Sequence, residues 1–229
     1  MRGSVVWMVL AAACTQETPE SEHYAAVATA EWRADTIAVS VLFYGEYREP
    51  GGSSRLAADQ RAFASVQDQR RALMLKDPEP GDLAEHVWYV GALSFVGAAE
   101  DATVTLEVTN AELAAQPIVF PDALDLDPIP NTVSRAGGSL RVTWPPSDDE
   151  ITWWVTSGTC LVGAWSGDQV VMNRAWVGPD DGGLLLSRIE ATGECEVELH
   201  VQRYRDAHGA GGSVSRGVQS RVTTFRSVP

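Results

Sequence analysis

The chain has 229 residues, 31 of them acidic and 17 basic, and its formal net charge at pH 7 is −14. A surface this acidic repels phosphate backbones and anionic headgroups, which argues against nucleic-acid binding. The length suits one large domain or two domains of about 100 residues each, and the apolar content is sufficient for buried cores.

The first predicted element is an apolar run over residues 5–13, which follows the basic residue Arg2 and ends at Cys14. The run is too short to cross a bilayer as a helix, and small residues precede the cysteine as signal processing requires. The segment Leu10-Ala-Ala-Ala-Cys14 resembles the signal of bacterial lipoproteins. This resemblance implies that residues 1–13 are removed and that Cys14 is acylated, so that three acyl chains anchor the protein. The alternative is an ordinary secretory signal followed by a spare thiol.

The same resemblance implies a location in the bacterial cell envelope. The family's retention signal for the inner membrane is typically Asp after the lipidated cysteine, whereas this chain has Thr15, which favours the outer membrane. Residues 14–22 then form a lipid-anchored tether, because residues 15–22 are polar, acidic and interrupted by Pro19. No other stretch reaches the length of a transmembrane helix, so we expect membrane contact through the lipid alone.

Residues 23–121 have the period-two pattern of β-strands. Residues 36–44 and 103–109 alternate apolar and less apolar side chains, so each presents one face to a core. Residues 87–96 form a further apolar strand candidate. Residues 56–75 are ambiguous, because their Ala, Gln and Arg content favours a helix, whereas short strands fit a chain otherwise made of strands. We predict an N-terminal β-sandwich domain over residues 23–121, with short strands in the ambiguous segment.

A segment rich in proline and aspartate separates the two halves of the chain. Residues 116–130 contain four prolines and three aspartates, and neither a helix nor a central strand can run through so many prolines. We therefore place the domain boundary between residues 121 and 122. Asp122, Asp125 and Asp127 offer hard oxygen ligands at this joint and are a candidate calcium site, although their spacing matches no calcium-binding loop. The alternative is a solvated linker.

Alternation resumes after the linker and predicts a C-terminal β-sandwich domain over residues 122–229. Strands are expected at residues 139–144, 151–155, 169–177, 184–189, 194–202 and 214–225. Cys195 shares its face of the strand with Val197 and Leu199, so its thiol points toward the core. With Cys14 acylated, Cys160 and Cys195 are left as a pair in an oxidising compartment, which predicts a disulfide; two buried thiols are the alternative.

Two segments of the second half carry a resemblance to a known fold family. The segment from Ser139 to Ser147 (SLRVTWPPS) and the segment from Cys195 to Arg203 (CEVELHVQR) resemble two strands of fibronectin type III or related immunoglobulin-like modules, with Trp144 at the place of the core tryptophan. The resemblance departs from the type III pattern at Cys195, where the family has an aromatic residue. It implies an all-β fold of two tandem β-sandwich domains, as in uncharacterised bacterial lipoproteins that the whole chain resembles.

No sequence motif indicates a catalytic site or a cofactor. The four histidines, His23, His86, His200 and His208, have no common local spacing, and no nucleophile elbow, zinc-binding helix or phosphate-binding loop occurs. We expect no catalytic residues, no cofactor and no metal apart from the calcium candidate. A hydrolase site assembled from residues distant in the sequence is the remaining enzymatic alternative.

The tryptophans are the strongest candidates for binding. Trp153 and Trp154 are adjacent in a predicted strand, so their side chains must point to opposite faces, one into the core and one outward. We therefore expect a non-enzymatic, lipid-anchored envelope protein that binds or assembles with a protein partner through the outward ring. The alternative is a glycan- or peptidoglycan-binding module that stacks the exposed tryptophan on a sugar ring.

Overall fold

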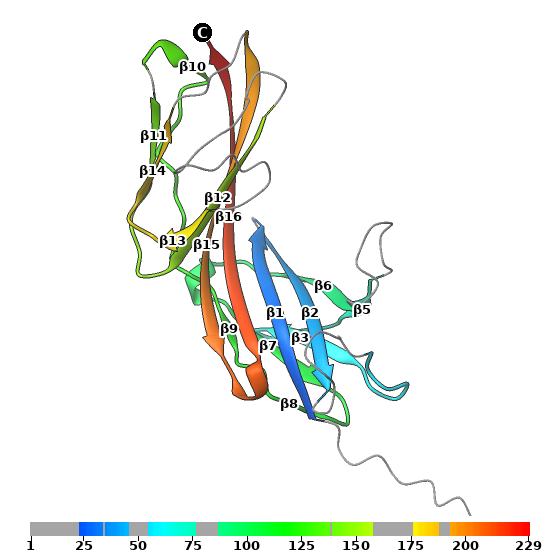
Figure 1. Ribbon diagram of the computed structural model, residues 1–229. Helices are drawn as coiled ribbons and strands as arrows, with labels where there is room; N and C mark the ends of the chain where they lie inside the picture. The colour runs from blue at the N-terminus through cyan, green and yellow to red at the C-terminus, as the bar shows by residue number, and fades with distance from the viewer. Residues whose placement is uncertain are drawn as a thin grey trace, which may run out of the picture.

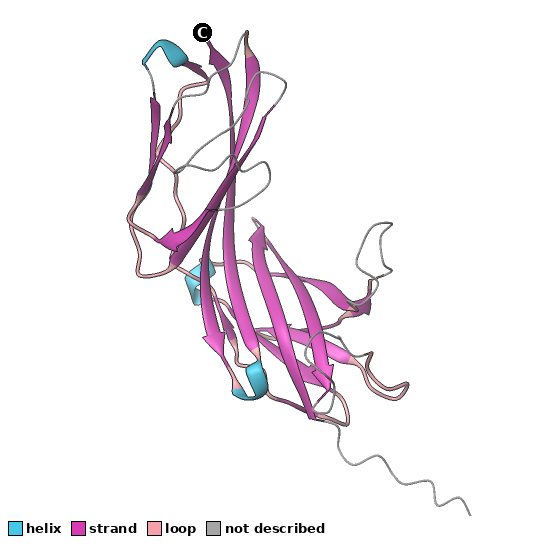
Figure 2. Ribbon diagram, in the orientation of Figure 1, coloured by secondary structure: helices cyan, strands magenta, loops and turns pink. Residues whose placement is uncertain are grey.

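The structure is a computed structural model, and it describes residues 23–33, 35–45, 55–76, 87–137, 139–157, 176–187 and 193–229. This part of the chain is all-β, with three short 3₁₀ turns and no α-helix (Figure 2). The predicted all-β class is therefore confirmed. The predicted signal peptide, Cys14 and the predicted tether lie outside the described residues, as does Cys160.

Sixteen strands are present in the described residues. In the first half of the chain they are β1 (His23–Arg33), β2 (Thr36–Gly45), β3 (Ala62–Val66), β4 (Gln69–Ala72), β5 (Met74–Leu75), β6 (Trp88–Ser94), β7 (Thr103–Val108), β8 (Glu112–Leu113) and β9 (Ile118–Val119). In the second half they are β10 (Thr132–Ser134), β11 (Ser139–Thr143), β12 (Glu150–Ser157), β13 (Trp176–Pro179), β14 (Gly183–Ser187), β15 (Cys195–His208) and β16 (Val214–Val228). The short turns are η1 (Ala99–Asp101), η2 (Arg135–Gly137) and η3 (Ala210–Gly212).

The predicted strands of the first half match the structure closely. Residues 36–44 and 103–109 correspond to β2 and β7, and the ambiguous residues 56–75 contain the short strands β3, β4 and β5. Strand β1 alternates buried and half-buried residues along its length, but three of its buried positions are alanines. Because alanine is only weakly apolar, this strand has a faint signature in the sequence.

Two buried clusters divide the molecule into two lobes. The N-terminal lobe is packed around residues that lie between Tyr24 and Phe120 in the sequence. The C-terminal lobe is packed around residues between Leu124 and Phe225, including Trp144 and Trp153. In each lobe a small sheet faces the large sheet across the cluster: β4-β3-β7-β9 in the N-terminal lobe and β11-β14 in the C-terminal lobe.

One sheet runs through both lobes. Its strands are hydrogen-bonded in the order β13-β12-β15-β16-β1-β2-β6-β5. Strands β15 and β16 pair with each other over their full length, from Cys195 opposite Ser227 to His208 opposite Val214. The lower half of β16 pairs with β1 in parallel, whereas its upper end pairs with β10. The last two strands thus belong to both lobes, and the molecule is elongated along them (Figure 1).

Candidate functional site

The proline-rich segment between the lobes lies against the inner face of β15 and β16. Ser215 Oγ donates a hydrogen bond of 2.7 Å to the carbonyl of Gln116, and Gln219 Nε2 donates one of 2.7 Å to the carbonyl of Pro121. At Gly217 a Cβ atom would lie only 2.2 Å from the Val119 carbonyl oxygen, so glycine is required for this approach. The backbone of residues 116–121 is therefore bound to the sheet, whereas Asp122, Asp125 and Asp127 are exposed to solvent.

Arg203 and Asp180 form a buried ion pair at the junction of the lobes. The guanidinium Nε of Arg203 lies 2.6 Å from Asp180 Oδ2, and both side chains are almost completely buried. The same guanidinium donates to the backbone carbonyls of Asp122, Ala123 and Pro145. The charged guanidinium therefore fixes the positions of these three carbonyls. Hydrogen bonds from a charged donor are stronger than those between neutral groups.

The second oxygen of Asp180 extends the network to the core tryptophan. Trp144 Nε1 donates a hydrogen bond of 2.6 Å to Asp180 Oδ1, which also accepts the backbone N–H of Gly182 at 3.2 Å. The tryptophan that carries the resemblance to type III modules is thus fixed by a carboxylate. This hydrogen bond connects the turn between β13 and β14, which contains Asp180, to the residue that follows β11.

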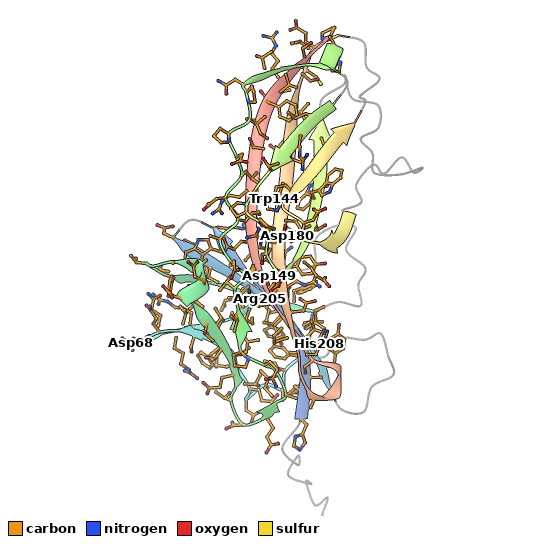
Figure 3. All side chains as sticks on the ribbon, turned by 90° about the vertical axis from the view of Figure 1, so that its left-hand side faces the viewer. Asp68, Trp144, Asp149, Asp180, Arg205 and His208 are labelled. Atoms are coloured by element: carbon orange, nitrogen blue, oxygen red, sulfur yellow. The ribbon has the colours of Figure 1, made fainter. Side chains whose placement is uncertain are left out.

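Arg205 and Asp149 form a second ion pair beside the first. Arg205 donates to both oxygens of Asp149, at 2.6 and 3.0 Å, and to the carbonyl of Phe120 at 3.3 Å. Burial raises the pKa of Asp149, but hydrogen bonds from Arg205 and Ser147 and the charge of Arg205 outweigh it, and the net pKa is lowered. In Figure 3, Trp144, Asp180, Asp149 and Arg205 follow one another from top to bottom in the middle of the molecule.

We call this group the interlobe clasp: Arg203, Arg205, Gln219, Asp149, Asp180 and the backbone of residues 120–124. Its donors and acceptors are directed at one another and at main-chain groups. Its evident chemical effect is to hold the segment between the lobes in one position against β15 and β16.

The three aspartates of the calcium candidate are turned toward different partners. Asp122 Oδ1 lies 3.3 Å from Arg205, Asp125 lies 3.8 Å from Arg221, and Asp127 accepts the Thr143 hydroxyl. In the described ranges, no three His, Cys, Asp or Glu side chains are grouped so that they could hold a metal ion. The structure therefore does not bring these carboxylates together.

Trp153 and Trp154 point to opposite faces of β12. Trp153 is buried in the cluster of the C-terminal lobe, whereas Trp154 is half-buried on the outer face of the large sheet. There its ring stacks on the imidazole of His200, with centroids 4.7 Å apart and planes at 9°. His200 is opposite Val222 in the register of β15 and β16, and Val222 is 55% exposed. We call Trp154, His200 and Val222 the outer-face row.

The remaining candidates are spread over the molecule. His23 contacts Glu112 at 3.0 Å near the start of β1, His200 contacts Glu198, and His208 is exposed at the end of β15. His86 is outside the described residues. Cys195 is half-buried and packs against the cluster of the C-terminal lobe, in line with its predicted inward direction. Its pairing with Cys160 stays a prediction, because Cys160 is not described.

Sequence reasoning missed the interlobe clasp and the role of His200. Arg203 continues the inward register of Val197, Leu199 and Val201, and an arginine at such a position needs a buried acid as its partner. That register was the available signal, but nothing in the sequence pointed to Asp180.

Comparisons with known proteins give no family for this chain. No protein-family model matches it, and no curated protein sequence matches it. Among the residues that the structure describes, no helix is long and apolar enough to cross a membrane.

Proposed function

We propose that this chain is a lipid-anchored protein of the bacterial cell envelope that binds a protein partner and catalyses no reaction. In this proposal residues 1–13 are removed, Cys14 carries the lipid, and the outer membrane holds the anchor. The lobes are two tandem immunoglobulin-like or fibronectin III-like sandwiches that share their last two strands. A disulfide between Cys160 and Cys195 stabilises the C-terminal lobe.

The observation that carries the binding proposal is the outer-face row. It places an aromatic stack beside Val222, which is one of five large hydrophobic residues exposed in the described part of the chain. Protein interfaces are enriched in aromatic residues at their centre and depleted of charge there. The chain has a net charge of −14, so it repels acidic partners. An apolar and aromatic surface such as the outer-face row can bind a partner without attraction between opposite charges.

The stacking geometry favours a protein partner over a glycan. A sugar ring binds by lying flat on an aromatic face, and the His200 imidazole already occupies one of the two faces of Trp154. The non-enzymatic part of the proposal is supported by the interlobe clasp. There the buried ionisable groups are hydrogen-bonded to one another and to the backbone, which is the pattern of a structural network.

The lipid anchor is tested by replacing the cysteine that would carry it. We expect C14S to lose the mass added by acylation and to leave the membrane fraction after cell lysis, because in this proposal the acyl chains hold the protein at the membrane. A C14S protein that remains membrane-bound with its full modification would contradict the anchor. A wild-type protein whose measured mass equals that of residues 1–229 without any modification would also contradict the anchor.

The binding surface is tested by capture from crosslinked envelopes with two matched variants. Val222 lies in the outer-face row, whereas Val96 is 91% exposed and follows β6 in the N-terminal lobe. We expect V222D to lose the captured protein and V96D to retain it. Equal capture by both variants would remove the row from the interface, and release of the captured material by peptidoglycan fragments would favour the glycan alternative.

A further inference from the structure

The first and last strands of the described chain are neighbours in the large sheet, and they point the same way. Val27 of β1 is opposite Val214 of β16, and the parallel pairing continues to Trp32 opposite Gln219. The start of β1 lies at the lower end of the molecule and the end of β16 at the upper end (Figure 1). When the two termini are pulled apart, the force therefore acts along the axis of both strands. It pulls β1 and β16 in opposite directions.

The direction of loading decides how such a pair of strands separates. In a parallel pair the interstrand hydrogen bonds are evenly spaced and slanted between the strands, so a force along the strands loads all bonds of the β1–β16 ladder together. A force across the strands would instead open the bonds one at a time. The first geometry resists force better, because many bonds must break in one step and forced unfolding is governed by the rate of that step.

The connection between the lobes has the same orientation. In the described residues, three segments pass from one lobe to the other: the segment 120–124, β15 and β16. Strand β16 alone has 15 residues, which corresponds to about 45 Å at the usual rise per residue. Its pairing with β15 is continuous across the junction, so the lobes are not joined by a single flexible strand of chain.

The interlobe clasp ties the third segment to the other two. Arg203 binds the carbonyls of Asp122 and Ala123, and Arg205 binds the carbonyl of Phe120. Gln219 receives the N–H of Leu124 and donates to the carbonyl of Pro121. A force applied to the C-terminal lobe is thereby distributed over three chain segments: residues 120–124, β15 and β16.

We propose that this protein is a load-bearing tie, built to carry tension along its long axis between an attachment at its N-terminal end and a partner held by its C-terminal lobe. The source of the load rests on the proposed function, which supplies the anchor at Cys14 and the partner at the outer-face row. The mechanical property itself rests on the β1–β16 pairing and the clasp. It exists in the chain whether or not the lipid is attached.

Single-molecule pulling in two geometries tests the proposal on the unlipidated mature chain. In the axial geometry the handles are at residues 15 and 229. In the transverse geometry they are at Gly193 and residue 229, which lie at the same end of β15 and β16, so that the force opens the antiparallel pair from its end. We expect the axial unfolding force to exceed the transverse force by at least about twofold at the same pulling speed.

Two matched arginine variants test the clasp. R205M removes a contact between the lobes, whereas R70M removes the exposed pair between Arg70 and Glu107, 3.0 Å apart within the N-terminal lobe. R205M should lower the axial force and R70M should leave it unchanged. Equal forces in the two geometries, or an equal loss in both variants, would overturn the proposal. Because these measurements use neither lipid nor partner, their outcome is independent of the C14S and V222D experiments.

Discussion

Replacing Arg203 by methionine should destabilise the protein more than any surface substitution of the same type. Arg203 is 1% exposed, and its ion pair with Asp180 has an Nε–Oδ2 distance of 2.6 Å with the carboxylate fully buried. R203M keeps the apolar stem but leaves Asp180 charged without its cation and removes the donor from three backbone carbonyls. Removing one partner of a buried pair costs about 3 to 5 kcal/mol.

The control is an arginine on the same pair of long strands that remains partly in water. Arg216 contacts both oxygens of Asp206 at 2.7 Å, but its side chain is 41% exposed. Screening by solvent reduces the contribution of such a pair to about 1 kcal/mol or less. Urea unfolding followed by tryptophan fluorescence gives both losses of free energy from the shift of the midpoint. Similar losses for R203M and R216M would refute the conclusion that burial makes the Arg203–Asp180 pair more important for stability than an exposed pair.

Three further outcomes follow from the geometry of single residues. W153A should lose about 3 to 5 kcal/mol because it empties a core site, whereas W154A should lose clearly less, and equal large losses in thermal melts would mean that both rings are buried. G217A should lose about 1 to 3 kcal/mol in the same melts, since its Cβ would approach the Val119 carbonyl oxygen to 2.2 Å, and an unchanged melting temperature would contradict that close contact. The pKa of Asp149 in the folded protein lies below its ordinary value of 3.8. The stabilisation by its carboxylate is therefore present above about pH 4 and is lost as the pH falls through the folded-state pKa. D149N should lose less stability than the wild type when the pH is lowered, and the same pH dependence of unfolding free energy in both proteins would count against the ion pair.

The local structure of this chain follows from its pattern of apolar residues to a large extent. The alternation in residues 36–44 and 103–109 predicts β2 and β7 with errors of about one residue. The opposite directions of Trp153 and Trp154 follow from strand geometry alone. These features depend on neighbours in the sequence, so the sequence carries them directly.

The features that depend on distant residues were not predicted. The continuous sheet requires Val27 to meet Val214, and no local pattern specifies which strand pairs with which. The prolines of residues 116–130 correctly exclude a central strand, but they do not tell that this segment is bound by its carbonyls to β15 and β16. Arg203 illustrates the reason: its inward register is local, whereas the identity of its buried partner is set by the fold.

The shared sheet also has a consequence for the order in which the protein folds. Strand β1 is synthesised early, but its neighbour β16 in the sheet is the last strand of the chain. The Ala26 N–H donates a hydrogen bond to the hydroxyl of Ser213, 187 residues away. Closing loops of this length before their contacts form makes folding slow. Until β16 arrives, the edge of β1 is unpaired and open to strands of other chains. A chain truncated before residue 214 should therefore aggregate through its N-terminal half, although every buried residue of the first cluster is present in it.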